Sequence, residues 1–438
     1  MSLVLLHTAD WHLGKTLHGA SLHRAHSAFA AWLVELVVER EVDVVLVAGD
    51  VFDRSVPPAQ AEEVYYSLLA ELGQRAPGVS VVVVAGNHDG PARLAAPAPM
   101  LGRLGVTVVG GVPVVAGSGD GRAEPDLAAL VVPLRRRDGT LAGQLVAMPF
   151  LRPSDLSLVD LSGPGAPVAA AGSVAAGRAL YERATEIARA RNRAAGGGAL
   201  VASGHGHVRG ARLSPDSERA LLGGDDAALP VDVFPSDLDY VALGHLHLAQ
   251  ALGPGGRVRY AGAPIPLAFS ERAYPHQVVL VQLGAGAVRA EEIPVPRALE
   301  LRRVAGPAGE ALTFDEAIAA LHAEGAHATT AERWVQVRVR LDGPRPALKR
   351  ELAAALEQGA RSVGAGAPPR LVHVDVERPA HRPEGPVEPL AWPELTPRAV
   401  LSRAWASTSE APVPEPLVDA LEQAWRDVLA FEAPSEGA

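Results

Sequence analysis

Cysteine is absent from this chain of 438 residues, which excludes both disulfide bonds and thiolate metal sites. Long apolar runs are absent as well, since no stretch approaches the roughly 18 residues that would cross a membrane. The first residues, Met1 to Leu6, enter a strand directly, without the basic and apolar segments of a signal peptide. We therefore expect a cytoplasmic protein without a membrane partner.

Lysine is scarce too, because only Lys15 and Lys349 are lysines among the 40 basic residues and the other 38 are arginines. The codon usage of a GC-rich genome explains this bias, although arginine forks also suit phosphate groups. The formal net charge of −10 does not exclude a nucleic-acid partner, because phosphate binding depends on a local basic patch. Two dications in a site would also add positive charge that a count of residues omits.

The order of predicted strands and helices indicates an α/β fold. Between residues 3 and 86, apolar strand-like runs alternate with helical patterns, which is typical of right-handed crossovers that build a parallel or mixed sheet. Further strand-like runs lie between residues 199 and 283, and a helix is predicted at 173–194. We predict two sheets packed face to face as a sandwich, with helices on the outside.

The length of the chain predicts more than one domain, and the pattern changes near residue 294. We predict a first domain at 1–293, a small α+β cap domain at 294–385, and a linker with a helical tail at 386–438. A proline-rich segment at 379–397 precedes the tail. The elements predicted for the last two regions are strands at 334–341 and 371–376 and helices at 346–361, 397–407 and 414–431.

Residue types that bind metals or transfer protons gather in five short blocks, each at the end of an apolar strand-like run. In chain order the blocks are Asp10-Trp11-His12, Gly49-Asp50, Gly86-Asn87-His88-Asp89, Gly204-His205 and Gly244-His245-Leu246-His247. In open α/β sheets, the edge beyond the carboxyl ends of the strands is the usual binding site. The ligand atoms are oxygen and imidazole nitrogen, without sulfur, which suits two divalent metals such as Mn²⁺.

Strand geometry suggests which of these side chains act together. Side chains two residues apart in a strand point the same way. This rule predicts that Asp10 and His12 reach one metal together, and that His245 and His247 lie on a common side. Glycines directly precede the ligands of the last four blocks, where they allow sharp turns and a close approach of the backbone.

Asp50 and the third block, Gly86-Asn87-His88-Asp89, are expected to supply the bridging ligand, a neutral ligand and the proton donor. Asp50 stands alone after its strand, so its two carboxylate oxygens are placed to bridge two ions, and Asn87 offers a neutral carbonyl oxygen. His88 is expected to point away from the metals, free to protonate the leaving alkoxide as a general acid or to orient the phosphate. Each block alone is a weak signal, because such residues are common in turns. Five blocks at strand ends together predict a dinuclear centre.

Five longer segments narrow the comparison with known proteins: TADWHLGKTLHG (8–19), AGDVFDRSVPP (48–58), AGNHDGPARL (85–94), LDYVALGHLHLAQ (238–250) and RYAGAPIPLAFSE (259–271). Their order resembles that of the calcineurin-like metallophosphoesterases. Within these enzymes, the chain is similar to the nuclease subunits of bacterial complexes that process DNA ends. The likeness covers roughly residues 1–300 at the level of motifs and continues more loosely, by domain order, into the cap and tail.

The resemblance implies a role for each candidate residue. It implies that one Mn²⁺ is held by Asp10, His12 and His247, that the other is held by Asn87, His205 and His245, and that Asp50 bridges them. It places His88 at the catalytic histidine, with Asp53 and Asp89 orienting the ligands. The implied activity is hydrolysis of DNA, as a 3′-to-5′ exonuclease on duplex ends and as an endonuclease on hairpins and single strands.

The resemblance also implies partners, namely DNA, an ATPase with a long coiled coil, and a second copy of the chain within a heterotetramer. Helices predicted at 21–40 and 58–73 are candidates for the contact between copies. The tail supports a protein partner independently, because one helical stripe is formed by Leu417, Leu421, Trp425 and Val428. Such a stripe behind a proline-rich linker suggests docking into a partner's groove. Packing on the cap domain is the alternative.

Other activities of the same metals fit the sequence less well than the nuclease does. A small-molecule or cyclic-nucleotide phosphodiesterase commonly lacks a cap and a helical tail, so residues 298–438 count against it. A protein phosphatase fits less well, because Arg54 is followed by Ser55 and the third block ends in Asp89, where those enzymes favour Gly and Glu. A non-catalytic DNA-end tether is expected to lose ligands, and none of the expected ligands is missing from the sequence.

Overall fold

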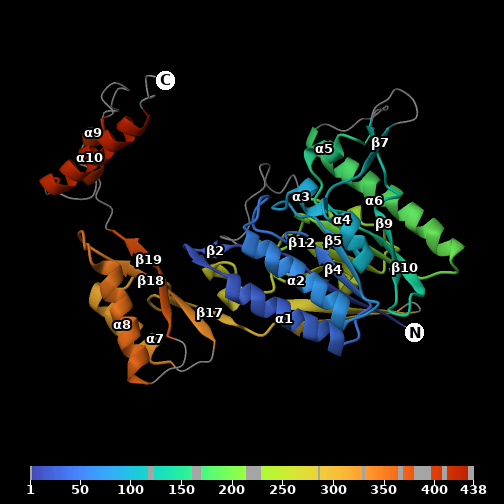
Figure 1. The fold of residues 1–438 in the computed structure, drawn as a ribbon, viewed down its shortest axis with the longest axis horizontal. Coiled ribbons are helices and arrows are strands. Elements are labelled where there is room, and N and C mark those ends of the chain that lie inside the picture. Colours follow the sequence, from blue (N-terminus) through green and yellow to red (C-terminus); the bar gives the residue numbers. More distant parts are fainter. Residues whose placement is uncertain are drawn as a thin grey trace. The chain divides into compact units, whose positions relative to one another are not determined.

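A computed structural model describes residues 2–116, 123–159, 169–213, 228–284, 287–327, 331–363, 368–378, 396–406 and 412–432. The predicted proline-rich linker lies outside these residues, apart from its last two positions. The chain divides into two compact units, Met1–Arg302 with Thr329–Trp334 and Arg303–Ala328 with Val335–Ala438. In Figure 1 the first unit runs from blue to yellow, and the second is orange and red.

The first sheet of the larger unit has the strand order β16-β15-β1-β4-β5-β6. The strands are β1 (Leu3–Thr8), β4 (Val44–Ala48), β5 (Ser80–Val84), β6 (Val106–Val109), β15 (Gln277–Gly284) and β16 (Ala287–Pro294). β1, β4, β5 and β6 pair with one another in parallel, with Leu5 opposite Val44 and Val44 opposite Ser80. β15 pairs antiparallel with β1, and β16 pairs antiparallel with β15. The carboxyl ends of β1, β4 and β5 therefore meet at one edge.

The second sheet has the strand order β13-β14-β12-β11-β10-β9. The strands are β9 (Val131–Arg135), β10 (Leu141–Val146), β11 (Ala199–His205), β12 (Tyr240–Gly244), β13 (Gln250–Leu252) and β14 (Val258–Tyr260). β10, β11, β12 and β14 pair in parallel in this order. The outer strand β9 pairs antiparallel with β10, and the outer strand β13 pairs antiparallel with β14. The carboxyl ends of β11 and β12, where two of the predicted histidine blocks begin, are adjacent.

The two sheets face each other across a shared apolar core. Leu5, Leu46 and Val82 from the first sheet belong to one buried cluster with Val201 and Leu243 from the second. Short strands of branched apolar residues, buried on both faces, are typical of parallel sheets that are covered on both sides. The predicted two-sheet α/β sandwich is confirmed.

Helices cover the outside of the sandwich. Figure 1 shows α1 (His23–Glu39) and α2 (Ala59–Arg75) side by side in front of β4 and β5, and α6 (Ala169–Ala194) along the second sheet. α1 buries Phe29 and Leu33, four residues apart, as expected of the apolar stripe of an amphipathic helix. Each of these helices connects two neighbouring parallel strands of one sheet. Because the chain returns through a helix each time, the carboxyl ends of the connected strands lie at the same edge of the sheet.

A three-stranded sheet of order β17-β18-β19 carries two helices that pack on it, and all of these elements lie in the smaller unit except the first residues of β17 and β18. The elements are β17 (Leu299–Val304), α7 (Phe314–Gly325), β18 (Glu332–Arg340), α8 (Leu348–Ser362) and β19 (Arg370–Glu377). Val335, Val337 and Val339 alternate into a core that also contains Leu321 and Leu356 of the helices. The sequence pattern predicts β18, α8 and β19 but misses β17 and α7.

The tail contains two helices in contact, α9 (Pro397–Ala406) and α10 (Glu415–Glu432). Both correspond to helices predicted from the sequence. Within the described part of the chain, every helix is too short or too polar to cross a membrane.

Candidate metal centre

Sharp backbone turns carry the polar residues beyond the strand ends. β1 ends at Thr8, and both Asp10 and His12 then have positive φ angles, of 55° and 47°. Asp50 after β4 has a φ of 51°, and His245 after β12 has a φ of 99°. L-residues rarely adopt such angles, and backbone strain of this kind gathers at functional sites. The alternation rule applied to Asp10 and His12 is therefore wrong, because turns beyond the strand bring them together.

Glycines let these turns approach one another. A Cβ atom on Gly49 would lie 2.1 Å from His205 Nδ1, and one on Gly86 would lie 2.1 Å from Asp50 Oδ1. Neither position can therefore hold a larger residue unless a ligand moves. The close approach predicted at these two glycines is confirmed.

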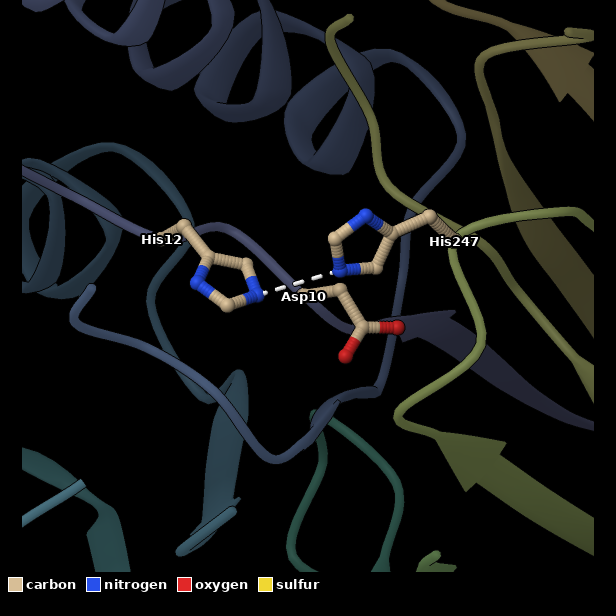
Figure 2. A group of neighbouring side chains, drawn as sticks. All are labelled: Asp10, His12 and His247. Carbon is tan, nitrogen blue, oxygen red and sulfur yellow. Dashed lines mark hydrogen bonds between the residues drawn. The ribbon is translucent and has the colours of Figure 1, made fainter. Parts of the chain in front are cut away.

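Asp10, His12 and His247 form a first cluster of potential ligands (Figure 2). Their ligand atoms all lie within 4.8 Å of one another, and His12 Nε2 and His247 Nε2 face each other at 3.2 Å. Asp10 Oδ1 accepts a hydrogen bond from His245 N at 2.8 Å, whereas its buried Oδ2 has no hydrogen-bond partner among the described residues. An uncompensated buried carboxylate oxygen beside two imidazole nitrogens fits a bound cation.

Asn87, His205 and His245 form a second cluster. Asn87 Oδ1 lies 3.0 Å from His205 Nε2 and 2.9 Å from His245 Nδ1. His245 and His247 therefore face different clusters, although they are two residues apart. The common side that strand alternation predicts for them is wrong, because β12 ends at Gly244 and alternation no longer applies beyond it.

Asp50 lies between the two clusters. Its Oδ2 is 3.5 Å from His12 Nε2 and 3.3 Å from His205 Nε2. Its Oδ1 accepts a hydrogen bond from His88 N at 2.8 Å. The structure thus brings together all seven residues that the sequence predicts as ligands, in an arrangement compatible with a dimetal site: Asp10, His12, Asp50, Asn87, His205, His245 and His247.

Two of the imidazoles are held from behind at Nδ1. His205 Nδ1 donates to the carbonyl of Ala48 at 2.8 Å, and His247 Nδ1 donates to Glu271 Oε1 at 2.8 Å. Such a contact fixes the tautomer and directs Nε2 toward the centre, as is usual for histidines that bind metals. The ring orientation that a metal requires is therefore present in the chain itself.

Glu271 is a site residue that sequence reasoning missed. It is fully buried, and its second oxygen accepts a hydrogen bond from Leu267 N at 2.8 Å. Burial favours the neutral acid, but the hydrogen bond with His247 outweighs it and lowers the pKa of Glu271. The one local signal is an acidic residue at the end of a largely apolar segment, far from any predicted ligand block.

Asp53 supports two histidines at once. Its Oδ1 lies 3.3 Å from His12 Nδ1, and its carbonyl accepts a hydrogen bond from His88 Nδ1 at 2.9 Å. The rings of His12 and His88 are 4.7 Å apart between centroids, and a ligand atom of His88 lies within 4.8 Å of those of His12 and Asp50. His88 is therefore close enough to act on a phosphate held at the centre, or to bind a metal itself.

The carboxylate of Asp89 accepts hydrogen bonds from backbone groups. It accepts hydrogen bonds from Gly86 N and Phe52 N, both at 2.9 Å. These bonds fasten the loop that carries Asn87 to the loop that carries Asp50. Burial, followed by the negative charge of Asp50, raises the pKa of Asp89 to about 6.

Burial and charge set the protonation of the cluster. Burial lowers the pKa of His12 to about 4 and that of His245 to about 3, so both rings are neutral at neutral pH. Burial acts in the same direction on His205, but the Asp50 carboxylate outweighs it and raises the pKa of His205 to about 9. Burial raises the pKa of Asp10 to about 6. His205 thus carries a proton at neutral pH, which a metal ion would have to displace in order to bind its Nε2.

Metal binding is therefore expected to release about one proton per chain at neutral pH, chiefly from His205. The apparent affinity for Mn²⁺ should rise with pH between the pKa of Asp10, about 6, and that of His205, about 9, because protons compete with the metal over this range. Calorimetric titration of metal-free protein in two buffers of different ionisation enthalpy measures the released proton. An affinity that stays constant across this range would contradict the competition.

The fold and the site together are typical of a class of protein, the metal-dependent phosphoesterases, whose α/β sandwich carries ligand clusters compatible with a dimetal site at its strand ends. The family model of the calcineurin-like phosphoesterases matches residues 3–249. The D subunit of the nuclease SbcCD from Rhodobacter capsulatus is 38% identical over 411 residues, which are 92% of this chain and 94% of that protein. The corresponding protein of Escherichia coli is 36% identical over 295 residues, 67% of this chain and 68% of that protein.

A third relative, the D subunit of the nuclease SbcCD from Bacillus subtilis, is 32% identical over 290 residues, 64% of this chain and 66% of that protein. The chain belongs to the calcineurin-like phosphoesterase family and, within it, to the family formed by the D subunits of SbcCD nucleases. The resemblance found in the sequence motifs is confirmed.

Proposed function

We propose that the chain is a Mn²⁺-dependent DNA nuclease, the nuclease subunit of an SbcCD-type complex that processes DNA ends in repair, replication and recombination. It would act in the cytoplasm as a 3′-to-5′ exonuclease on duplex ends and as an endonuclease on hairpins and single strands. The observation that carries this proposal is the convergence of seven oxygen and nitrogen ligands in a chain whose relative, matched over 94% of its length, is named a nuclease.

Each metal ion is assigned to one cluster of ligands. One ion would be held by Asp10, His12 and His247, the other by Asn87, His205 and His245, with Asp50 between the two. Carboxylate, amide and imidazole ligands without sulfur suit Mn²⁺. When bound, two such ions supply the Lewis acidity that activates water and offsets negative charge on the phosphate.

The proton transfer of the reaction is assigned to His88. Because the carbonyl of Asp53 holds its Nδ1, the atom left to give a proton to the departing alkoxide is Nε2. The carboxylate of Asp53 also lies 3.3 Å from Nδ1 of His12, so Asp53 contacts both the proposed proton donor and a ligand of the first metal cluster. Asp89 contributes by holding the backbone of the same loop.

One assay separates the nuclease from its main alternative. Purified protein with Mn²⁺ is incubated with labelled hairpin DNA, a chromogenic phosphodiester and a cyclic nucleotide. We expect cleavage of the hairpin and slow hydrolysis of the chromogenic ester, both lost on chelation of the metal. Turnover of the cyclic nucleotide with the hairpin left intact would assign the site to small-molecule phosphodiester hydrolysis instead.

The tail is proposed to bind an SbcC-like ATPase with a long coiled coil. Two large apolar side chains of α10 are exposed, Leu417 by 41% and Trp425 by 47%, on the stripe that the sequence predicts. Side chains of this kind on one helix face suit a partner's hydrophobic groove. We also propose a homodimer within a heterotetramer, supported by a groove between α1 and α2 that is lined in part by Ala30, Val34 and Leu68.

Deleting residues 397–438 is expected to abolish co-purification with an SbcC-like ATPase while hydrolysis of the chromogenic phosphodiester persists, because the site lies in the other unit. Trp425→Glu should weaken the same interaction, whereas Asp419→Ala, a change at an exposed polar position of the same helix, should not. Pull-down of the ATPase by the truncated chain would show that docking occurs elsewhere.

A further inference from the structure

Lys15 is one of two lysines in a chain that otherwise uses arginine for 38 of its 40 basic residues. The other lysine, Lys349, is exposed on α8. Unlike Lys349, Lys15 contacts Asp53 beside the predicted metal ligands, and this contact suggests a role for its ammonium group.

The ammonium group of Lys15 and the ring of His12, a predicted metal ligand, both contact the same oxygen of the Asp53 carboxylate. Lys15 Nζ donates to Asp53 Oδ1 at 3.0 Å, and the same oxygen lies 3.3 Å from His12 Nδ1. The backbone of Lys15 is fixed on both sides, because its N–H donates to the carbonyl of His12 and its carbonyl accepts from Leu22 N. The side chain therefore starts from a fixed point and reaches a fixed carboxylate.

Arg54, the other cationic residue near Asp53, does not make the close contact that Lys15 makes. Arg54 follows Asp53 directly, but its Nε is 3.9 Å from Asp53 Oδ2 and its side chain is 71% exposed. The side chain of Lys15 is only 25% exposed. A compact ammonium with three donors fits a partly buried position against a single oxygen, whereas a planar guanidinium is longer and favours a two-pronged contact.

We propose that Lys15 is a positioning residue of the metal centre. Its ammonium donates a hydrogen bond to the Asp53 carboxylate, which lies 3.3 Å from Nδ1 of His12, and the carbonyl of Asp53 accepts a hydrogen bond from Nδ1 of His88. Without Lys15 the carboxylate is free to rotate, and the ring of His12 loses its support. The inference rests on the proposed metal site, but its test does not require that the substrate be DNA.

The test compares Lys15→Met, Lys15→Arg and the matched control Lys349→Met in the full-length chain. Calorimetric titration of metal-free protein with Mn²⁺ should show affinity reduced by about 10-fold or more in Lys15→Met, the cost usual for losing support behind a ligand. Lys15→Arg should not restore it, and Lys349→Met should bind as the wild type does. The turnover number should fall to a similar extent on hairpin DNA and on the chromogenic phosphodiester.

Three results would overturn the proposal. Unchanged Mn²⁺ affinity with a raised KM for DNA alone would make Lys15 a contact to the substrate. Full recovery in Lys15→Arg would show that charge suffices, and wild-type behaviour of Lys15→Met would remove any role. If wild-type DNA cleavage is absent while the metal affinities follow the expected order, the nuclease assignment fails and the positioning role stands.

A measurement on folded protein covers the case in which Lys15→Met does not fold. Reductive methylation with ¹³C-formaldehyde labels only the two lysines and the terminal amine, so the Lys15 signal can be assigned by comparison with Lys349→Arg. In metal-free protein, Asp53→Asn should shift the Lys15 signal and leave the Lys349 signal in place. A Lys15 signal that ignores Asp53→Asn would refute the contact.

Discussion

Replacing Asp50 with alanine is expected to strip both metal positions and to abolish Mn²⁺-dependent hydrolysis. Its Oδ2 lies 3.5 Å from His12 Nε2 and 3.3 Å from His205 Nε2, so one carboxylate contacts both clusters. We expect the rate to fall by roughly 100-fold or more, because losing only the support behind a ligand costs about 10–100-fold. Elemental analysis of the purified variant measures the bound metal, and cleavage of labelled hairpin DNA measures the activity.

The controls for Asp50→Ala separate the loss of metal from the loss of fold. Thermal unfolding of the metal-free variant is compared with that of metal-free wild type, so that any difference reflects the chain alone. Asp138→Ala removes an exposed carboxylate in the turn between β9 and β10 and should leave metal content and activity unchanged. Retained Mn²⁺-dependent cleavage in Asp50→Ala would contradict the bridging role.

Replacing His88 with alanine is expected to abolish DNA cleavage while about two equivalents of metal remain bound. Its Nδ1 is held by the carbonyl of Asp53, and no step in metal binding is assigned to its Nε2. Loss of a general acid typically costs about 10²–10⁴-fold in rate. Single-turnover cleavage of hairpin DNA, with metal analysis on the same sample, gives both quantities.

The leaving group distinguishes the two roles left open for His88. A nitrophenolate needs no proton to depart, so a general acid should matter far less for the chromogenic phosphodiester than for DNA. An equal loss on both substrates would indicate that His88 orients the phosphate. Because His88 lies within 4.8 Å of the ligand atoms of His12 and Asp50, a variant that loses metal would show that it is a ligand instead.

Much of the sandwich could be predicted because its elements carry local signals. β1, β4 and β5 are short runs of branched apolar residues, and α1 shows a clear helical stripe. β16 could not be predicted, since most of its residues are exposed and it is defined by pairing along its length with β15. Such pairing joins backbone groups, which the side-chain pattern does not encode.

α7 is a different case, because its local signal is present in the sequence. Thr313 and Glu316 form a capping box at its start, the Thr-x-x-Glu pattern that marks the beginning of a helix. Glu271 carried no comparable signal. Its role depends on a contact with His247, and that contact exists only because the chain after β14 returns to the strand ends.

The sequence by itself determined which ligand types are available, their order along the chain, and that each follows an apolar strand. Only the tertiary structure decided which ligand faces which cluster and which residues stand behind the rings. His12 and His247 meet although 235 positions separate them, and His245 turns away from His247 through a positive φ. Alternation along a strand is a local rule, whereas these turns are held by contacts between distant segments, so the local rule fails where the site begins.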